Sequence, residues 1–172
     1  FHSYGTEGDR KFSSGAASIA EAINRNPNIS ADVGQILFGQ TVTASGDNMS
    51  QHRNRKFASP DKWVVMDIEC DAGCGIVPFK YRDQSFVNAL QWAIGLEIFL
   101  LVNDPWRVVL PTAHPNGGPF TSYPHLIKLL MDRGFRNEQL AKLHPDVAAN
   151  AALRAITREL SLYEIAIMTR AA

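Results

Sequence analysis

The chain has 172 residues, which suits one domain or part of a larger one, and its 45% hydrophobic content is enough to bury a core. Its 17 basic and 17 acidic residues give a formal net charge of zero at pH 7, which removes the electrostatic argument for a nucleic-acid or polyanion partner. The short basic run over residues 51–56 is interpreted as a solvated loop.

The first third of the chain predicts one helix and one buried strand. Residues 1–13 are typical of a strand end followed by a polar loop, and the Ala and Ile spacing over 14–25 predicts a helix that Asn26-Pro27-Asn28 ends. The apolar run over 31–39 is consistent with a buried strand. Residues 40–61 are polar and irregular, so we expect a surface excursion there.

A second strand is predicted over residues 62–69, KWVVMDIE, because its core is apolar and β-branched. Asp67 and Glu69 share one face of this strand, where one of them could line a site or form a salt bridge. Cys70 and Cys74 form a lone C-x3-C that lacks the second pair of a zinc site. Free thiols and the absence of a signal peptide favour the cytoplasm.

A long helix capped by Ser85 is predicted to run to about Val102. It is apolar nearly all round and close to the roughly 20 residues that span a bilayer. Asn88, Gln91 and Glu97 interrupt it, however. We therefore expect a helix buried inside a large protein or assembly, and no membrane partner.

The segment after this helix predicts a short strand over 106–110 and a further helix. Thr121 or Ser122 can cap that helix, with Pro124 in its first turn. Gly134 is expected to end it.

Two more helices are expected toward the end of the chain, one near 146–157 and one opened by the capping box SLYE at 161–164. Alternating helices and continuously apolar strands predict an α/β fold with a parallel sheet. The sequence has no G-x-G-x-x-G fingerprint, P-loop or internal repeat.

The stretch VLPTAHPNGGPF, at 109–120, concentrates conformational restriction beside one histidine. Pro115 favours an extended backbone at His114, and Asn116-Gly117 is a strong turn signal. His114 is therefore expected at the carboxyl end of a strand, where parallel α/β folds place their chemistry. A tight loop whose histidine only bonds to backbone remains the alternative.

The other histidines carry weaker signals. His2 lies in FHSYG, which is typical of a strand end running into a turn, and neutral imidazole is a common metal ligand. A structural role for His2 is the alternative. His52, His125 and His144 are interpreted as structural.

Several long stretches together resemble the catalytic A subunits of formylmethanofuran dehydrogenases and of bacterial formyltransferase/hydrolase complexes. They cover most of the chain: SGAASIAEAIN, DVGQILFGQTVT, VNALQWAIGLEIFLLVNDPWRVVL, HPNGGPFTSYPHLIKLLMDRGFR and LSLYEIAIMTRAA. These subunits belong to the amidohydrolase superfamily. The resemblance implies that residues 1–172 are a single partial domain, the carboxyl-side half of a TIM-like (β/α)8 barrel.

The resemblance also implies the chemistry. The family uses a dinuclear zinc site of histidines, a carboxylated lysine and an aspartate to hydrolyse or form the N-formyl group of a methanofuran-type carrier. A His-x-His and the lysine would precede residue 1. His2 is then a candidate metal ligand, and His114 and Asn116 are candidate catalytic residues. Other subunits of such a complex are the expected partners.

One departure from the family pattern T-T-D-H-P-N-G-G-P-F divides the hypotheses. Ala113 stands where the family has an aspartate that binds metal and transfers a proton. General acid–base help is worth roughly 10² to 10⁴ in rate, and a methyl group supplies none. The sequence therefore leaves two functions open: a zinc-dependent hydrolase subunit, or a non-catalytic scaffold of the same kind of complex.

Overall fold

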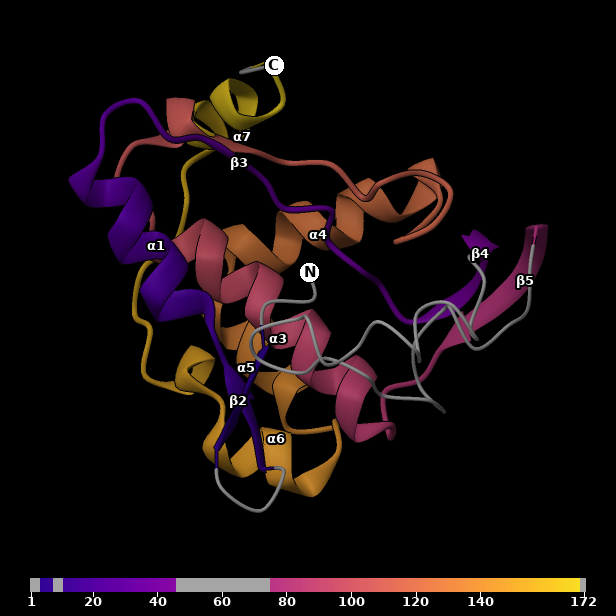
Figure 1. The fold of residues 1–172 in the computed structure, drawn as a ribbon. Coiled ribbons are helices and arrows are strands. Elements are labelled where there is room, and N and C mark those ends of the chain that lie inside the picture. The colour runs from indigo at the N-terminus through magenta and orange to yellow at the C-terminus, as the bar shows by residue number, and fades with distance from the viewer. Residues whose placement is uncertain (1–3, 8–10, 46–74, 171–172) are drawn as a thin grey trace.

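A computed structural model describes residues 4–7, 11–45 and 75–170, and a buried helix lies at its centre (Figure 1). This helix, α3, spans Phe86–Leu101, and every residue from Val87 to Leu100 is buried. The Ser85 side chain caps it by accepting from the Asn88 backbone N–H at 3.3 Å. The predicted buried helix and its cap are confirmed. Among the residues the structure describes, no helix is long and apolar enough to cross a membrane.

The other helices surround α3 or pack against its neighbours (Figure 1). Helix α1, at Ala16–Arg25, lies along α3 and buries Ala16, Ala20 and Ile23, as its 3.6-residue spacing predicts. The remaining helices are α4 at Tyr123–Met131, α5 at Arg133–Leu140, α6 at Pro145–Asn150 and α7 at Leu162–Met168, with α1 at Ala16–Arg25. Single 3-10 turns are η3 at Pro105–Arg107, η4 at Phe120–Ser122 and η5 at Ala152–Arg154.

Six strands form three two-stranded pairs within the described part of the chain. They are β1 at Tyr4–Glu7 with β2 at Lys11–Ser14, β3 at Ala31–Asp32 with β6 at Val108–Val109, and β4 at Gly39–Ser45 with β5 at Gly75–Tyr81. The β3–β6 pair is parallel and the other two are antiparallel. Helices and a parallel pair together give the α/β class that the sequence predicted. The β4–β5 ribbon extends from the helical part at one edge of the molecule (Figure 1).

Several predicted boundaries differ from the structure. Residues 40–61 were expected to be an irregular surface excursion, but residues 40–45 are regular, since Gly39–Ser45 forms β4 paired with β5. The remainder of that segment lies outside the described residues, as do the predicted strand over 62–69 and both cysteines. The expected strand over 31–39 is regular only at Ala31–Asp32, although residues up to Leu37 continue to bond to the chain after β6.

The C-terminal helices also differ in detail. Gly134 does not end a helix: α4 ends at Met131, and the Asp132 carboxylate caps α5 by accepting from the Phe135 N–H at 2.8 Å. Ser122 precedes α4 without a side-chain cap bond. The helix expected near 146–157 breaks into α6 and η5 because Ala151 is extended between them. The capping box of α7 is confirmed, with both of its reciprocal bonds present.

A buried carboxylate joins three of these elements. Glu97 of α3 is 1% exposed and accepts hydrogen bonds from the Ser14 hydroxyl at 2.5 Å and the Leu153 N–H at 2.9 Å. Burial raises the pKa of Glu97, against the opposing effect of these bonds. Glu97 thus ties β2 and η5 to the central helix.

Candidate functional site

The segment 111–118 follows β6 and is bonded along one side to the extended chain that follows β3. The Gln35 N–H donates to the Pro111 carbonyl at 2.8 Å, and the Leu37 N–H donates to the Gly117 carbonyl at 2.7 Å. We call residues 111–118 the His114 loop. Because its two ends are bonded two residues apart on one extended chain, the intervening residues must turn outward.

Inside the His114 loop, buried groups hold the turn closed. The Thr112 side chain is fully buried, and its hydroxyl donates to the Gly118 carbonyl at 2.9 Å. The Asn116 N–H donates to the Ala113 carbonyl at 2.8 Å. The His114–Pro115 peptide is cis. The sequence indicated that the backbone is restricted here, and hydrogen bonds from a backbone N–H and a buried hydroxyl hold the loop in its turn.

His114 lies on the exposed side of this loop. Its ring stacks on that of Phe120, with centroids 3.9 Å apart and planes 21° from parallel. Its Nδ1 lies 3.4 Å from the Gly118 carbonyl oxygen. Since a carbonyl only accepts, Nδ1 donates in this contact when the neutral ring carries its proton there, and the lone pair is then on Nε2. In that tautomer Nε2 is the ring nitrogen that can accept a hydrogen bond or bind a metal.

Asn116 faces the opposite way, into the ribbon of β4 and β5. Its Oδ1 accepts from the Tyr81 hydroxyl at 3.2 Å. Its carbonyl accepts from the Thr41 hydroxyl at 2.8 Å, and the same hydroxyl also contacts the Pro115 carbonyl. The Asn116 side-chain oxygen is thus engaged within the fold, and His114 is the more exposed of the two candidate residues.

Thr41 and Tyr81 were not candidates in the sequence, yet both touch the loop. Thr41 lies in the segment predicted to be an excursion. The run Thr41-Val42-Thr43, with three consecutive β-branched residues, is the signal that could have indicated a strand. Their convergence on one loop depends on strand pairing, which no local pattern reveals.

Ala113 has the positive backbone angle φ of 48°, the left-handed region that disfavours alanine. It is exposed. An aspartate or asparagine tolerates this conformation better because its short polar side chain can bond locally.

The described residues do not supply a zinc site on their own. Within residues 4–7, 11–45 and 75–170, no group of three or more His, Cys, Asp or Glu side chains could hold a metal ion. His2, the predicted ligand, lies outside the described residues.

His144 caps α6 by accepting from the Asp146 N–H at 3.3 Å. His125 packs edge-on against Phe135, and burial, followed by the charge of Lys128, lowers its pKa.

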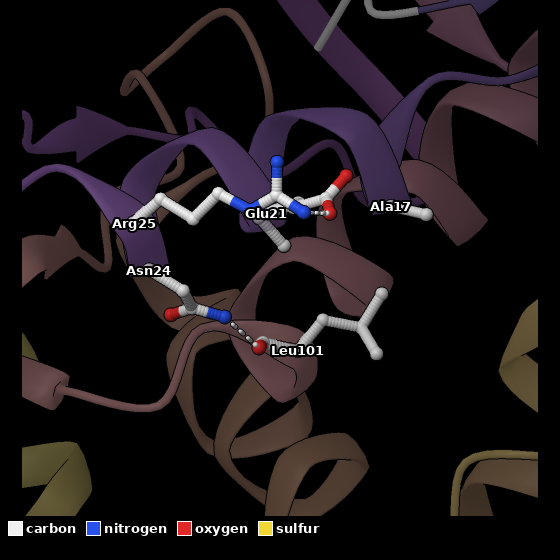
Figure 2. A pocket seen from close by; sticks show the side chains of 6 residues that line it. Ala17, Glu21, Asn24, Arg25 and Leu101 are labelled. Carbon is white, nitrogen blue, oxygen red and sulfur yellow. Dashed lines mark hydrogen bonds and ion pairs between the residues drawn. The ribbon is translucent and has the colours of Figure 1, made fainter.

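A surface pocket lies elsewhere, between α1 and the end of α3 (Figure 2). Its polar groups are already engaged: Glu21 forms an ion pair with Arg25, and the Asn24 side chain donates to the Leu101 carbonyl at 3.0 Å. No residue of the His114 loop lines it. The pocket therefore offers no chemistry that would compete with the loop as the candidate site.

The family model that describes the amidohydrolase family matches residues 1–172. The chain belongs to the amidohydrolase family. It is 46% identical over 175 residues to the A subunit of the formyltransferase/hydrolase complex Fhc of Methylorubrum extorquens, a match that covers 99% of this chain and 32% of that protein. It is 41% identical over 172 residues to Protein FwdA of Methanocaldococcus jannaschii, covering 99% of this chain and 30% of that protein.

A solved structure agrees with these relatives. It is the X-ray structure of the formyltransferase/hydrolase complex FhcABCD from Methylorubrum extorquens with methylofuran. One of its chains is 46% identical to this one, with a TM-score of 0.76 over 96% of this chain and 31% of that chain. The chain thus spans about a third of the length of the amidohydrolase relatives it matches, and its α/β fold corresponds to a part of the larger barrel-like domain.

Proposed function

We propose that this amidohydrolase segment is part of the A subunit of a formyltransferase/hydrolase or formylmethanofuran dehydrogenase complex. Its reaction is hydrolysis, or the reverse formation, of the N-formyl group of a methanofuran-type carrier in one-carbon metabolism. The observation that carries the proposal is 46% identity, over 99% of this chain, to the A subunit of an Fhc complex. The solved complex that contains methylofuran supports the class of carrier. The proposal places the protein in the cytoplasm beside its partner subunits.

The contribution of this chain to the reaction is the His114 loop. His114 lies in the loop that follows β6, and in this proposal its Nε2 accepts a hydrogen bond or proton from the carrier or from water. Asn116 holds the loop to the ribbon. Zinc remains part of the proposal only as a site built mainly by residues outside those described, with His2 as one of its ligands. The described residues do not fit such a site alone, so no step is derived through it.

A second candidate function rests on one specific observation. Ala113 stands beside His114 where the family pattern has an aspartate, and a methyl group transfers no proton. On this alternative the segment is a scaffold that packs against partner subunits. The nearly complete burial of α3 is compatible with either function, because both need a rigid core.

The test uses the full-length subunit within its complex. Release of formate from the N-formyl carrier is measured together with zinc content by elemental analysis. The hydrolase proposal expects bound zinc and turnover above a His114→Ala variant. A complex with neither zinc nor turnover supports the scaffold.

Two substitutions at Ala113 separate a disabled site from a scaffold. Ala113→Asp restores the carboxylate, and Ala113→Asn is its control because it has similar size and tolerance of the positive φ but cannot carry a carboxylate charge. A gain in formate release of roughly 10² or more with Asp alone identifies a hydrolase site that lacks one group. Equal rates for both variants and the parent favour the scaffold.

A further inference from the structure

The β4–β5 ribbon reaches the His114 loop through two hydroxyl groups. Thr41 of β4 and Tyr81 of β5 lie far apart in the sequence but both contact the turn at Pro115 and Asn116. In the ribbon register, Thr41 is opposite Phe79 and Gly39 is opposite Tyr81. The two residues are therefore diagonal neighbours across the strands, and one face of the ribbon presents both hydroxyls to the same turn.

Both hydroxyls are enclosed where they make these contacts. Tyr81 is 1% exposed and Thr41 is 6% exposed. The Tyr81 ring is held in addition by edge-on packing against Phe79, with centroids 4.9 Å apart. Removing either hydroxyl therefore removes a contact that joins the ribbon to the turn.

The loop is thus held on two sides while His114 stays outside. The chain after β3 bonds to its ends at Pro111 and Gly117, and the ribbon bonds to its middle at Pro115 and Asn116. His114 lies between these bonded residues, and its imidazole is exposed. A displacement of the ribbon would therefore displace the turn that carries the His114 ring.

We propose that Thr41 and Tyr81 are positioning residues: their hydroxyls fix the turn at Pro115 and Asn116 and so aim His114 Nε2 at the reacting group. This inference rests on the proposed function for its catalytic consequence.

The test compares Thr41→Val and Tyr81→Phe in the full-length subunit with Thr157→Val and Tyr163→Phe. The control residues are exposed and lie outside the loop and ribbon, and Tyr163 is 73% exposed. We expect kcat for formate release to fall on the order of 10- to 100-fold in the ribbon variants, with KM changed less than about twofold, since misplacing a reacting group by about 1 Å costs up to 10². The controls should match the parent. Thr41→Ser, which keeps the hydroxyl, should restore kcat.

Hydrogen exchange supplies a readout that does not need turnover. The backbone amides of residues 112–114 and 116–118 should exchange faster in Thr41→Val and Tyr81→Phe, while amides of α3 keep their parent rates. Unchanged loop exchange, or equal acceleration throughout α3, overturns the positioning role, as does a kcat equal to that of the controls. If the parent itself shows no turnover, the proposed function fails, and loop exchange alone then decides the inference.

Discussion

Two adjacent glycines in the His114 loop have opposite steric surroundings, and their alanine variants should differ accordingly. A Cβ added at Gly117 would lie 2.2 Å from the Thr112 carbonyl oxygen and 2.7 Å from the Gln35 carbonyl oxygen. A Cβ added at Gly118 would meet nothing closer than Leu37 side-chain atoms at 3.5 Å, an ordinary contact. Both neighbours of Gly117 are backbone atoms, so no side-chain rotation relieves the clash.

The cost at Gly117 follows from these distances. Overpacking costs typically about 1–3 kcal/mol. Separating the two chains also weakens the bond from the Leu37 N–H to the Gly117 carbonyl, worth about 1 kcal/mol. Gly117→Ala should therefore destabilise the protein by about 2–4 kcal/mol. Gly118→Ala should stay within about 0.5 kcal/mol of the parent.

The assay is urea denaturation of the full-length subunit followed by fluorescence, with both variants and the parent under the same conditions. Hydrogen exchange of the Leu37 amide reports the local contact directly and should accelerate only in Gly117→Ala. Equal stability of the two variants would show that the loop does not approach residues 35–37 as closely as described.

Three further predictions concern the core and the helix ends. Because burial raises the pKa of Glu97, the folded state holds its proton more tightly than the unfolded state; this contribution is complete below the ordinary pKa of 4.5 and is lost as pH rises through the folded value. In urea titrations between pH 4 and 8, the free energy of unfolding should therefore fall in the parent and not in Glu97→Gln. An equal fall in both proteins would contradict this role of Glu97. Ser161→Ala should cost about 1 kcal/mol in thermal unfolding, since it breaks the capping box with Glu164; no loss would mean that α7 does not depend on its cap. Gly95→Ala places a Cβ 2.0 Å from Gln35 Oε1 and should lower the melting temperature despite the better helix propensity of alanine; a higher melting temperature would count against this packing.

The helices were predictable because their signals are local. Ser85 and Ser161 each accept from an N–H three residues later, so a few neighbouring letters contain the whole cap. The prediction at Gly134 was wrong because it also relied on a local signal. A glycine after an apolar stripe is typical of a helix end, but here α5 begins before it, at the Asp132 cap. The choice between these two local signals depends on how α5 packs against α4.

The strands and the residues that hold the His114 loop were harder to predict from the sequence, because their partners lie far away along the chain. Gly39–Ser45 is polar enough to suggest a loop and becomes a strand only by pairing with Gly75–Tyr81, beyond residues 46–74. The turn at residues 113–116 could be predicted, since Pro115 restricts its own backbone and that of His114, and Asn116-Gly117 is a local turn signal. The two hydroxyls that hold the loop could not be predicted, because the register that aligns them is a property of the pair.

Ala113 bears on function through its backbone as much as through its missing carboxylate. Its φ of 48° lies in the left-handed region, which costs an alanine roughly 1–2 kcal/mol and in which aspartate and asparagine are enriched. The loop therefore keeps a geometry better suited to the residue of the family pattern than to its own. Residue 113 is also exposed within the described part of the chain, so a restored carboxylate has no burial cost against these residues. Backbone misfit consequently cannot explain an inactive Ala113→Asp variant. Its activity, compared with Ala113→Asn, measures whether the rest of the catalytic site is still present.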